Sequence, residues 1–203
     1  MNKSLVSDCI KLFIITLAAG LILGFVYNVT KAPIAKQEEK TKQEAYKAVF
    51  KDADRFEAVK LNTKEIEKAL KAKNLGQNTV NEIAKAVDKS GKELGYVFSV
   101  TNPDGYGGDI TLSVGVKDDG TVNGYETLTI SETAGLGMKA KEDEFKSNFK
   151  NKKAKQFEVV KDGSGKNDDA KVDAISGATI TSRAVTSGVN SCVALMDTLK
   201  GGN

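Results

Sequence analysis

The chain of 203 residues has no histidine and no tryptophan, and it has only two cysteines and two prolines. Histidine is the commonest general base and transition-metal ligand, so its absence excludes Ser–His and Cys–His hydrolases and removes the usual ligand of transition metals. Cys9 and Cys192 stand near opposite ends of the chain, a number and spacing that suit neither zinc nor an iron–sulfur cluster. We therefore predict no metal site, and any redox chemistry must use an organic cofactor.

The net charge is also small, at +3. The lysines are scattered among nearly as many acidic residues, and no aromatic-rich basic stripe accompanies them. A nucleic-acid partner is therefore not predicted. The length suits one domain of ordinary size with accessory segments.

One long apolar run is present. Residues 12–30, LFIITLAAGLILGFVYNVT, carry no charge between Lys11 and Lys31. As a helix this run spans about 28 Å, close to the hydrocarbon thickness of a bilayer. A signal peptide is disfavoured, because no small-x-small cleavage site follows and the run is long for one. We predict an N-terminal segment over residues 1–11 and a single transmembrane helix over residues 12–30.

Two features of this span leave alternatives open. Gly20 and Gly24 form a G-x-x-x-G pair that either lets another helix approach closely or simply faces lipid. Lysines lie on both sides of the span, so their count does not favour an outside location for the domain that follows; they are Lys3 and Lys11 before it and Lys31, Lys36, Lys40 and Lys42 after it.

The remaining pattern predicts an α+β fold. Residues 31–79 are expected to form a helical stalk or linker, with a charged helix over 31–51 and a short helix capped by Asn62. Residues 80–203 are expected to form the main domain. Short turns separate its β-rich runs at 82–87, 94–101, 109–116 and 121–130, which favours an antiparallel sheet. A helix over 142–149, a strand over 156–160 and a final helix over about 181–199 with an apolar stripe complete the prediction.

The segment Asp173-Ala174-Ile175-Ser176-Gly177-Ala178-Thr179 comes just before this final helix. Small and hydroxylated residues at a helix start cap free N–H groups, and the helix dipole favours an anion there. A phosphate held at this place could be esterified by a threonine hydroxyl. From these residues alone, a cap with no further role is the favoured interpretation.

The sequence of this segment resembles the flavinylation motif of FMN-binding domains. That motif is Asp, two residues of any kind, Ser or Thr, Gly, Ala, and then Thr or Ser. In that family a flavin transferase joins FMN through its phosphate to the last residue, so the resemblance implies a phosphoester at Thr179. It also implies that the transferase reads Asp173, that Ser176 completes the motif, and that Gly177 and Ala178 leave room for the phosphate. Thr181 and Ser182 are further hydroxyls within reach.

Two more segments resemble the same domain, in the same order. Gly105-Tyr106-Gly107-Gly108-Asp109-Ile110 is similar to the family's G-Y-G-G-P-I turn, and residues 132–137, ETAGLG, are similar to its E-T-P-G-L-G loop, which faces the flavin. Asp109 and Ala134 replace the two prolines, so we expect looser loops. The resemblance implies that the cofactor contacts are Tyr106, Gly107, Gly108, Glu132, Thr133, Gly135, Leu136, Gly137, Met138 and Lys139. Leu136 and Met138 are candidates for apolar contacts with the ring, and Lys139 for offsetting negative charge.

Taken together, these features resemble the G subunit of the Rnf complex, the ion-translocating ferredoxin:NAD oxidoreductase. The resemblance implies an electron-transfer subunit with covalent FMN, whose partners are the other membrane and peripheral Rnf subunits, a flavin transferase and the lipid bilayer. NAD and ferredoxin would bind other subunits. It also implies a single-pass protein of the cytoplasmic membrane with its N-terminus inside and its FMN domain outside. We follow the resemblance on this orientation, although the distribution of lysines does not favour it. The alternatives are the C subunit of the sodium-pumping NADH:quinone oxidoreductase, which is typically longer, and a membrane-anchored FMN-binding envelope protein.

Overall fold

The computed structural model describes residues 3–60 and 62–201, and it divides into two compact units, residues 1–41 and 42–203. The first unit is helical. Helix α1, Lys3–Val49, contains the predicted span and continues through the predicted charged helix. It is long and apolar enough to cross a bilayer, and none of its apolar window is buried. This exposed apolar surface fits a membrane anchor.

Polar side chains within the apolar part of α1 bond to their own helix. The Thr16 and Thr30 hydroxyls donate to the carbonyls of Leu12 and Val26, at 3.0 and 2.9 Å. The Asn28 amide donates to the Gly24 carbonyl at 3.0 Å. Because the two threonine O–H groups already donate within the helix, they can enter hydrocarbon without a partner protein.

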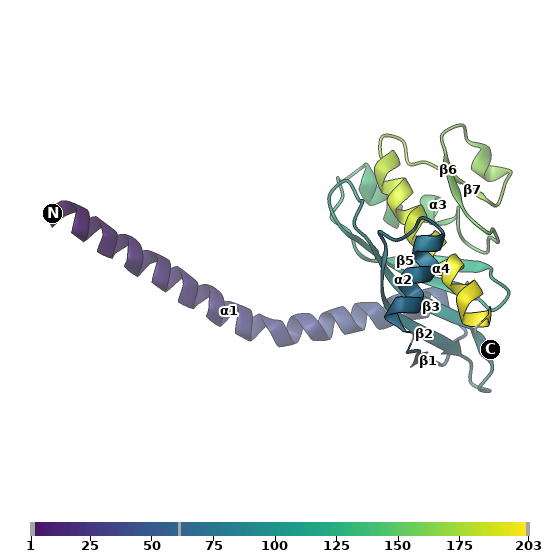
Figure 1. Cartoon of the computed structure of the whole chain (residues 1–203), viewed down its shortest axis with the longest axis horizontal. Helices are drawn as coiled ribbons and strands as arrows, with labels where there is room; N and C mark the ends of the chain where they lie inside the picture. Colours follow the sequence, from purple (N-terminus) through teal and green to yellow (C-terminus); the bar gives the residue numbers. More distant parts are fainter. Residues whose placement is uncertain (1–2, 61, 202–203) are drawn as a thin grey trace. The chain divides into compact units, whose positions relative to one another are not determined.

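The second unit is built on a five-stranded antiparallel sheet (Figure 1). Its strands follow one another in sequence order; they are β1 Arg55–Ala58, β2 Thr79–Val87, β3 Glu93–Asn102, β4 Ile110–Lys117 and β5 Val122–Thr129. The four predicted strands are confirmed. Strand β1 was not predicted, because its four residues, RFEA, are mostly exposed and too few to show an alternating pattern.

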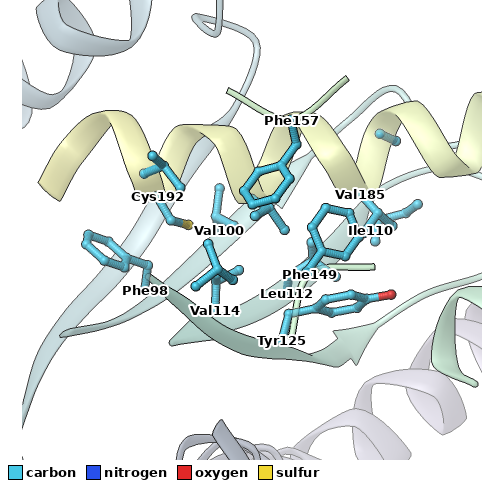
Figure 2. Packing of buried hydrophobic residues seen from close by; sticks show 14 of the residues in the cluster. Phe98, Val100, Ile110, Leu112, Val114, Tyr125, Phe149, Phe157, Val185 and Cys192 are labelled. Carbon is cyan, nitrogen blue, oxygen red and sulfur yellow. The ribbon is translucent and has the colours of Figure 1, made fainter. Parts of the chain in front are cut away.

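Two helices cover one face of the sheet. Helix α2, Thr63–Ala72, is capped by Asn62, whose side chain accepts from the Lys64 N–H at 3.1 Å. Helix α4, Thr179–Gly201, lies against β3 and β4 (Figure 1). Between α4 and the sheet, alternate β4 residues pack with the predicted helix stripe and a group of aromatic rings (Figure 2); the cluster includes Ile110, Leu112, Val114, Tyr125, Phe149, Phe157, Val185 and Cys192. The α+β prediction is thus confirmed.

The end of α1 covers part of the other face. Tyr46, Val49 and Phe50 are buried there against the strand residues Ala84 and Val97. The predicted linker over 31–79 therefore contains this helix end, β1 and α2, all of which pack within the unit of residues 42–203.

Three predicted elements differ in the structure. The helix expected over 142–149 is instead a 3-10 helix, η1 Gly137–Lys141, followed by a short helix, α3 Asp143–Lys146. Strand β6, Glu158–Val160, is shorter than expected, and it pairs in parallel with an unpredicted strand, β7 Lys171–Asp173. A 3-10 turn, η2 Ser164–Lys166, lies between them. Helix α4 begins at Thr179 rather than at 181. Three-residue strands are too short to show periodicity, so tertiary pairing alone defines β7.

Candidate functional site

The segment from Asp173 to Thr179 connects β7 to α4 and forms one wall of the candidate site. Its turn is closed by the Ala178 N–H, which donates to the Ile175 carbonyl at 2.9 Å. Gly177 lies within the turn at φ 74°, in the left-handed region that favours glycine. The turn therefore places Thr179 as the first residue of a 23-residue helix.

The three hydroxyls at this helix start have different surroundings. Ser182 is fully buried, and its hydroxyl accepts from the Ile175 N–H and donates to the Ala178 carbonyl, both at 2.9 Å. Thr181 is only 1% exposed. Thr179 is half-buried and lines a pocket of about 460 Å³. Thr179 is thus the most accessible of the three.

This pocket gathers the three sequence segments singled out above. Every lining residue comes from one of them or from the first turn of α4; the lining consists of Tyr106, Glu132, Thr133, Leu136, Gly137, Gly177, Ala178, Thr179, Ile180 and Thr181. Segments separated by more than 70 residues in sequence meet here because the β3–β4 loop, the segment after β5 and the start of α4 lie at the same end of the domain.

The loop that carries Tyr106 lies directly against the segment after β5. The Tyr106 N–H donates to the Glu132 carboxylate, at 2.9 Å from Oε1. The backbones also approach closely, because a Cβ added to Gly107 would stand 2.0 Å from the Ser131 carbonyl oxygen. Glycine is therefore required at 107 for packing between the loops.

The rim of the pocket is apolar. Tyr106, Leu136 and Ile180 are 73%, 42% and 52% exposed. Among the described residues from 42 to 60 and from 62 to 199, they are the large hydrophobic side chains that are exposed. Exposed apolar groups gathered at one pocket indicate a binding surface for an apolar ligand or partner.

The start of α4 adds a preference for negative charge. Ala178 precedes the helix and has no side-chain acceptor, and the first turn contains no acidic residue. The first backbone N–H groups of a helix lack intrahelical partners and carry partial positive charge. An anionic group bonded to Thr179 would lie beside these donors.

The predicted site residues do not all meet in this pocket. Gly107, Gly108, Gly135 and Met138 are outside its lining. Lys139, Asp173 and Ser176 line a separate pocket of about 340 Å³. There the Asp173 carboxylate accepts from the Gly165 N–H at 3.0 Å. Sequence reasoning missed Ile180 as a lining residue; the signal was an apolar residue that follows the motif directly but lies off the buried stripe of the helix.

No group of three or more His, Cys, Asp or Glu residues capable of holding a metal occurs in the part of the chain that the structure describes. The candidate site consists of the Thr179 hydroxyl, the Glu132 carboxylate, a group of exposed apolar side chains and the start of α4.

Comparisons with known proteins agree with this geometry. The FMN-binding domain family matches residues 105–194, which contain all three segments. The chain is 35% identical over 184 residues to the G subunit of the proton-translocating ferredoxin:NAD(+) oxidoreductase complex of Clostridium ljungdahlii, covering 91% of this chain and 87% of that protein.

Two further likenesses cover most of the chain. It is 34% identical over 190 residues to the G subunit of the Na(+)-translocating ferredoxin:NAD(+) oxidoreductase complex of Acetobacterium woodii, covering 93% of this chain and 89% of that protein. The crystal structure of the C subunit of the Na(+)-translocating NADH-quinone reductase of Parabacteroides distasonis is similar with a TM-score of 0.51 and 25% identity, over 74% of this chain and 80% of that one.

Proposed function

The chain belongs to the family of G subunits of ion-translocating ferredoxin:NAD(+) oxidoreductase (Rnf) complexes, and we propose that it carries its FMN covalently at Thr179. Membership of this family, with an FMN-binding domain, makes the chain an electron-transfer subunit of a membrane oxidoreductase complex. What the proposal adds is the attachment atom, the residues that hold the ring and the side of the membrane.

The observation that carries the proposal is the accessibility of one hydroxyl. Thr179 and Thr181 both line the 460 Å³ pocket, but Thr179 is half-buried whereas Thr181 is only 1% exposed. Ser182 is fully buried, and its hydroxyl both donates and accepts. An enzyme that delivers a nucleotide can reach only a hydroxyl at the surface. Among the three hydroxyls at this helix start, the geometry therefore supports Thr179 as the acceptor.

The residues present fit an FMN. A volume of about 460 Å³ lies within the usual range for small-molecule sites. Tyr106, Leu136 and Ile180 offer apolar surface to a flat ring and would shield it from water, and the first N–H groups of α4 suit its phosphate. When bound, the isoalloxazine supplies the redox chemistry, while the protein supplies position and electrostatics.

Attachment requires one substitution at phosphorus. The Thr179 Oγ forms a bond to the FMN phosphorus of an activated flavin dinucleotide, and the pyrophosphate bond of that donor breaks. The hydroxyl proton leaves with the departing nucleoside monophosphate. The protein gains the mass of FMN less one water, and no electron is transferred in this step.

The proposed location explains why a covalent bond is useful. We place the N-terminus inside the cytoplasmic membrane and the FMN domain outside, as the family resemblance implies. A dissociated cofactor would be diluted there without a local supply, and a phosphoester prevents that loss. Helix α1 is long and apolar enough to hold the domain at the bilayer surface.

The proposed partners are the other Rnf subunits, the bilayer around α1 and a flavin transferase during maturation. The NAD and ferredoxin sites would lie on other subunits. We expect the transferase to read Asp173. Because the Asp173 carboxylate already accepts from the Gly165 N–H at 3.0 Å, the transferase must compete with that bond.

Mass spectrometry of the full chain, coexpressed with a flavin transferase, tests the attachment. The C-terminal peptide should gain FMN less water on Thr179, and Thr179→Ala should abolish the gain. Two matched controls should retain it: Thr181→Val, which replaces the buried neighbouring hydroxyl with an isostere, and Ser147→Ala, which removes an exposed hydroxyl of the other pocket that lies outside the motif. Modification of Thr181, or a chain of unchanged mass, would contradict the proposal.

The likeness to the C subunit of an NADH-quinone reductase keeps a second candidate in view. The Rnf relatives are more similar in sequence and cover 91–95% of the chain, whereas that structure covers 74%. Purification in mild detergent separates the two assignments. Copurifying subunits with ferredoxin-dependent NAD reduction support the Rnf assignment, and quinone-dependent NADH oxidation supports the other.

A further inference from the structure

Glu132 occupies a central place in the wall of the pocket that Thr179 lines. Its Oε1 accepts from the Tyr106 N–H at 2.9 Å, which joins two segments 26 residues apart. Of the side-chain hydrogen bonds recorded for residues 103–109, this is the one that reaches beyond the loop to a different segment. The position of Tyr106, which is 73% exposed, therefore depends on Glu132.

The second oxygen of the same carboxylate lies over Gly137. A Cβ added to Gly137 would stand 2.6 Å from Glu132 Oε2 and 2.7 Å from Thr181 Oγ1. Gly137 does not have a positive φ, so alanine is excluded there by space and not by backbone conformation. Glycine at 137 thus makes room for the Glu132 side chain beside the start of α4.

We infer that Glu132 is a positioning residue, which fixes the Tyr106 loop as a wall of the flavin pocket by accepting the Tyr106 N–H. The inference rests on the proposed function, in which Tyr106 contacts the ring. The requirement is for a hydrogen-bond acceptor and not for a negative charge. Glutamine, whose side-chain carbonyl accepts equally, should replace Glu132, and alanine should not.

The first test uses the chain without flavin, in detergent, and follows amide hydrogen exchange by NMR. The Tyr106 amide should be protected in the wild type and in Glu132→Gln, and it should lose that protection in Glu132→Ala. Gly137→Ala should cause the same loss, because its Cβ displaces the carboxylate without removing it. The Asp104 amide, which donates to Asn102 Oδ1 at 2.9 Å within the same loop, is the internal control and should exchange at an unchanged rate.

The second test uses the flavinylated chain and measures flavin fluorescence, which a stacked tyrosine quenches. Emission should rise in Glu132→Ala and Gly137→Ala to the level of Tyr106→Leu, and it should stay at the wild-type level in Glu132→Gln. Glu144→Ala, which removes an acidic residue from the other pocket, should change nothing.

The outcomes separate this inference from the proposed function. If the Tyr106 amide exchanges equally in Glu132→Ala and the wild type, Glu132 does not position the loop, whatever happens at Thr179. If Glu132→Gln behaves like Glu132→Ala in both tests, the charge matters and the inference is wrong. If protection changes as expected but mass spectrometry finds no FMN on Thr179, the hydrogen bond is established and the proposed function fails, and with it the role of Tyr106 at a flavin.

Discussion

The hydroxyl of Ser182 accepts a hydrogen bond from the backbone N–H of Ile175, seven residues earlier, at 2.9 Å. The same hydroxyl donates to the Ala178 carbonyl, so one side chain closes the turn that presents Thr179. The proposed flavinylation motif, residues 173–179, is therefore held in place by a residue that lies outside it.

Ser182→Ala should destabilise the domain without removing the Thr179 hydroxyl, the proposed acceptor. It leaves the buried N–H of Ile175 without its partner, which costs about 1–3 kcal/mol. Urea unfolding of the detergent-solubilised chain measures this loss. Ser191→Ala is a matched control, because that hydroxyl only donates to a carbonyl of its own helix. Equal stability of Ser182→Ala and the wild type would mean that another group caps the turn.

Gly177→Ala should strain the same turn. A non-glycine residue in the left-handed region costs about 1–2 kcal/mol, and the new Cβ would stand 3.1 Å from Leu136 Cδ2. We expect lower stability and slower flavin attachment, measured by unfolding and by a time course of the mass gain. Gly163→Ala is the control, since it has similar backbone strain at φ 75° but no atom within 4 Å of the new Cβ. Equal attachment rates in the two variants would show that Leu136 is not disturbed.

The end of α1 should be sensitive to the size of residue 115. A Cβ on Gly115 would stand 3.0 Å from the Val49 Cβ, so glycine lets the helix end approach β4. Gly115→Val should destabilise the domain by about 1–3 kcal/mol through overpacking. The free energy of unfolding from urea titration measures the effect. Gly20→Ala, with nothing within 4 Å of its new Cβ, should leave the stability of the domain unchanged.

The two cysteines provide a test of membrane orientation. Cys9 is exposed, whereas Cys192 is fully buried, donates to the Gly188 carbonyl and has a thiol pKa raised by burial. In intact cells, a membrane-impermeant maleimide should therefore leave the wild-type chain unlabelled if the N-terminus is inside. Lys153→Cys, at an exposed position in the domain, should become labelled. Labelling of Cys9 in sealed cells would reverse the proposed orientation.

Asp88 should contribute to the acid sensitivity of the domain. Hydrogen bonds from the Ser90 hydroxyl and then from the Lys92 backbone N–H lower the pKa of its carboxyl. The pKa of Asp88 in the folded state lies below its unfolded value of about 3.9. The stabilisation from its hydrogen bonds is therefore complete above the unfolded pKa, and it is lost as pH falls through the folded pKa. Asp88→Asn should show a shallower loss of stability below about pH 4, measured as the free energy of unfolding against pH. Glu57→Gln serves as the control. If Asp88→Asn and the wild type lose free energy of unfolding equally steeply with falling pH, Asp88 does not contribute to the acid sensitivity.

Local signals were sufficient for much of the fold. The four longer strands of the sheet are eight to ten residues long, rich in β-forming residues and bounded by turn residues, which was enough to predict them. Asn62 was recognised as a cap because capping is a local interaction. The stripe on α4 predicted burial of Val185 and Val189, and both are buried. Elements of three or four residues, such as β1 and β7, carry too few side chains for any period and were missed.

In the candidate site, too, the local sequence predicted some features and only the tertiary structure defined the others. The sequence of residues 173–179 was enough to propose a flavin phosphoester through its resemblance to the family motif, because such a motif is a short stretch of neighbouring residues. The order of the three segments indicated the family. Neither the motif nor the order of the segments could show which residues meet, because contacts between residues 26 to 73 positions apart depend on how the chain folds back through the sheet.

By itself, the sequence determined the apolar span, the fold class and the motif that contains the proposed acceptor threonine, since each depends on neighbours within a few turns or strands. Only the tertiary structure decided that Thr179 faces a pocket while Ser182 is used as a cap, that Glu132 holds Tyr106, and that Lys139 lines a different pocket. The physical reason is that burial and hydrogen bonding between distant segments arise only when the sheet and α4 pack together.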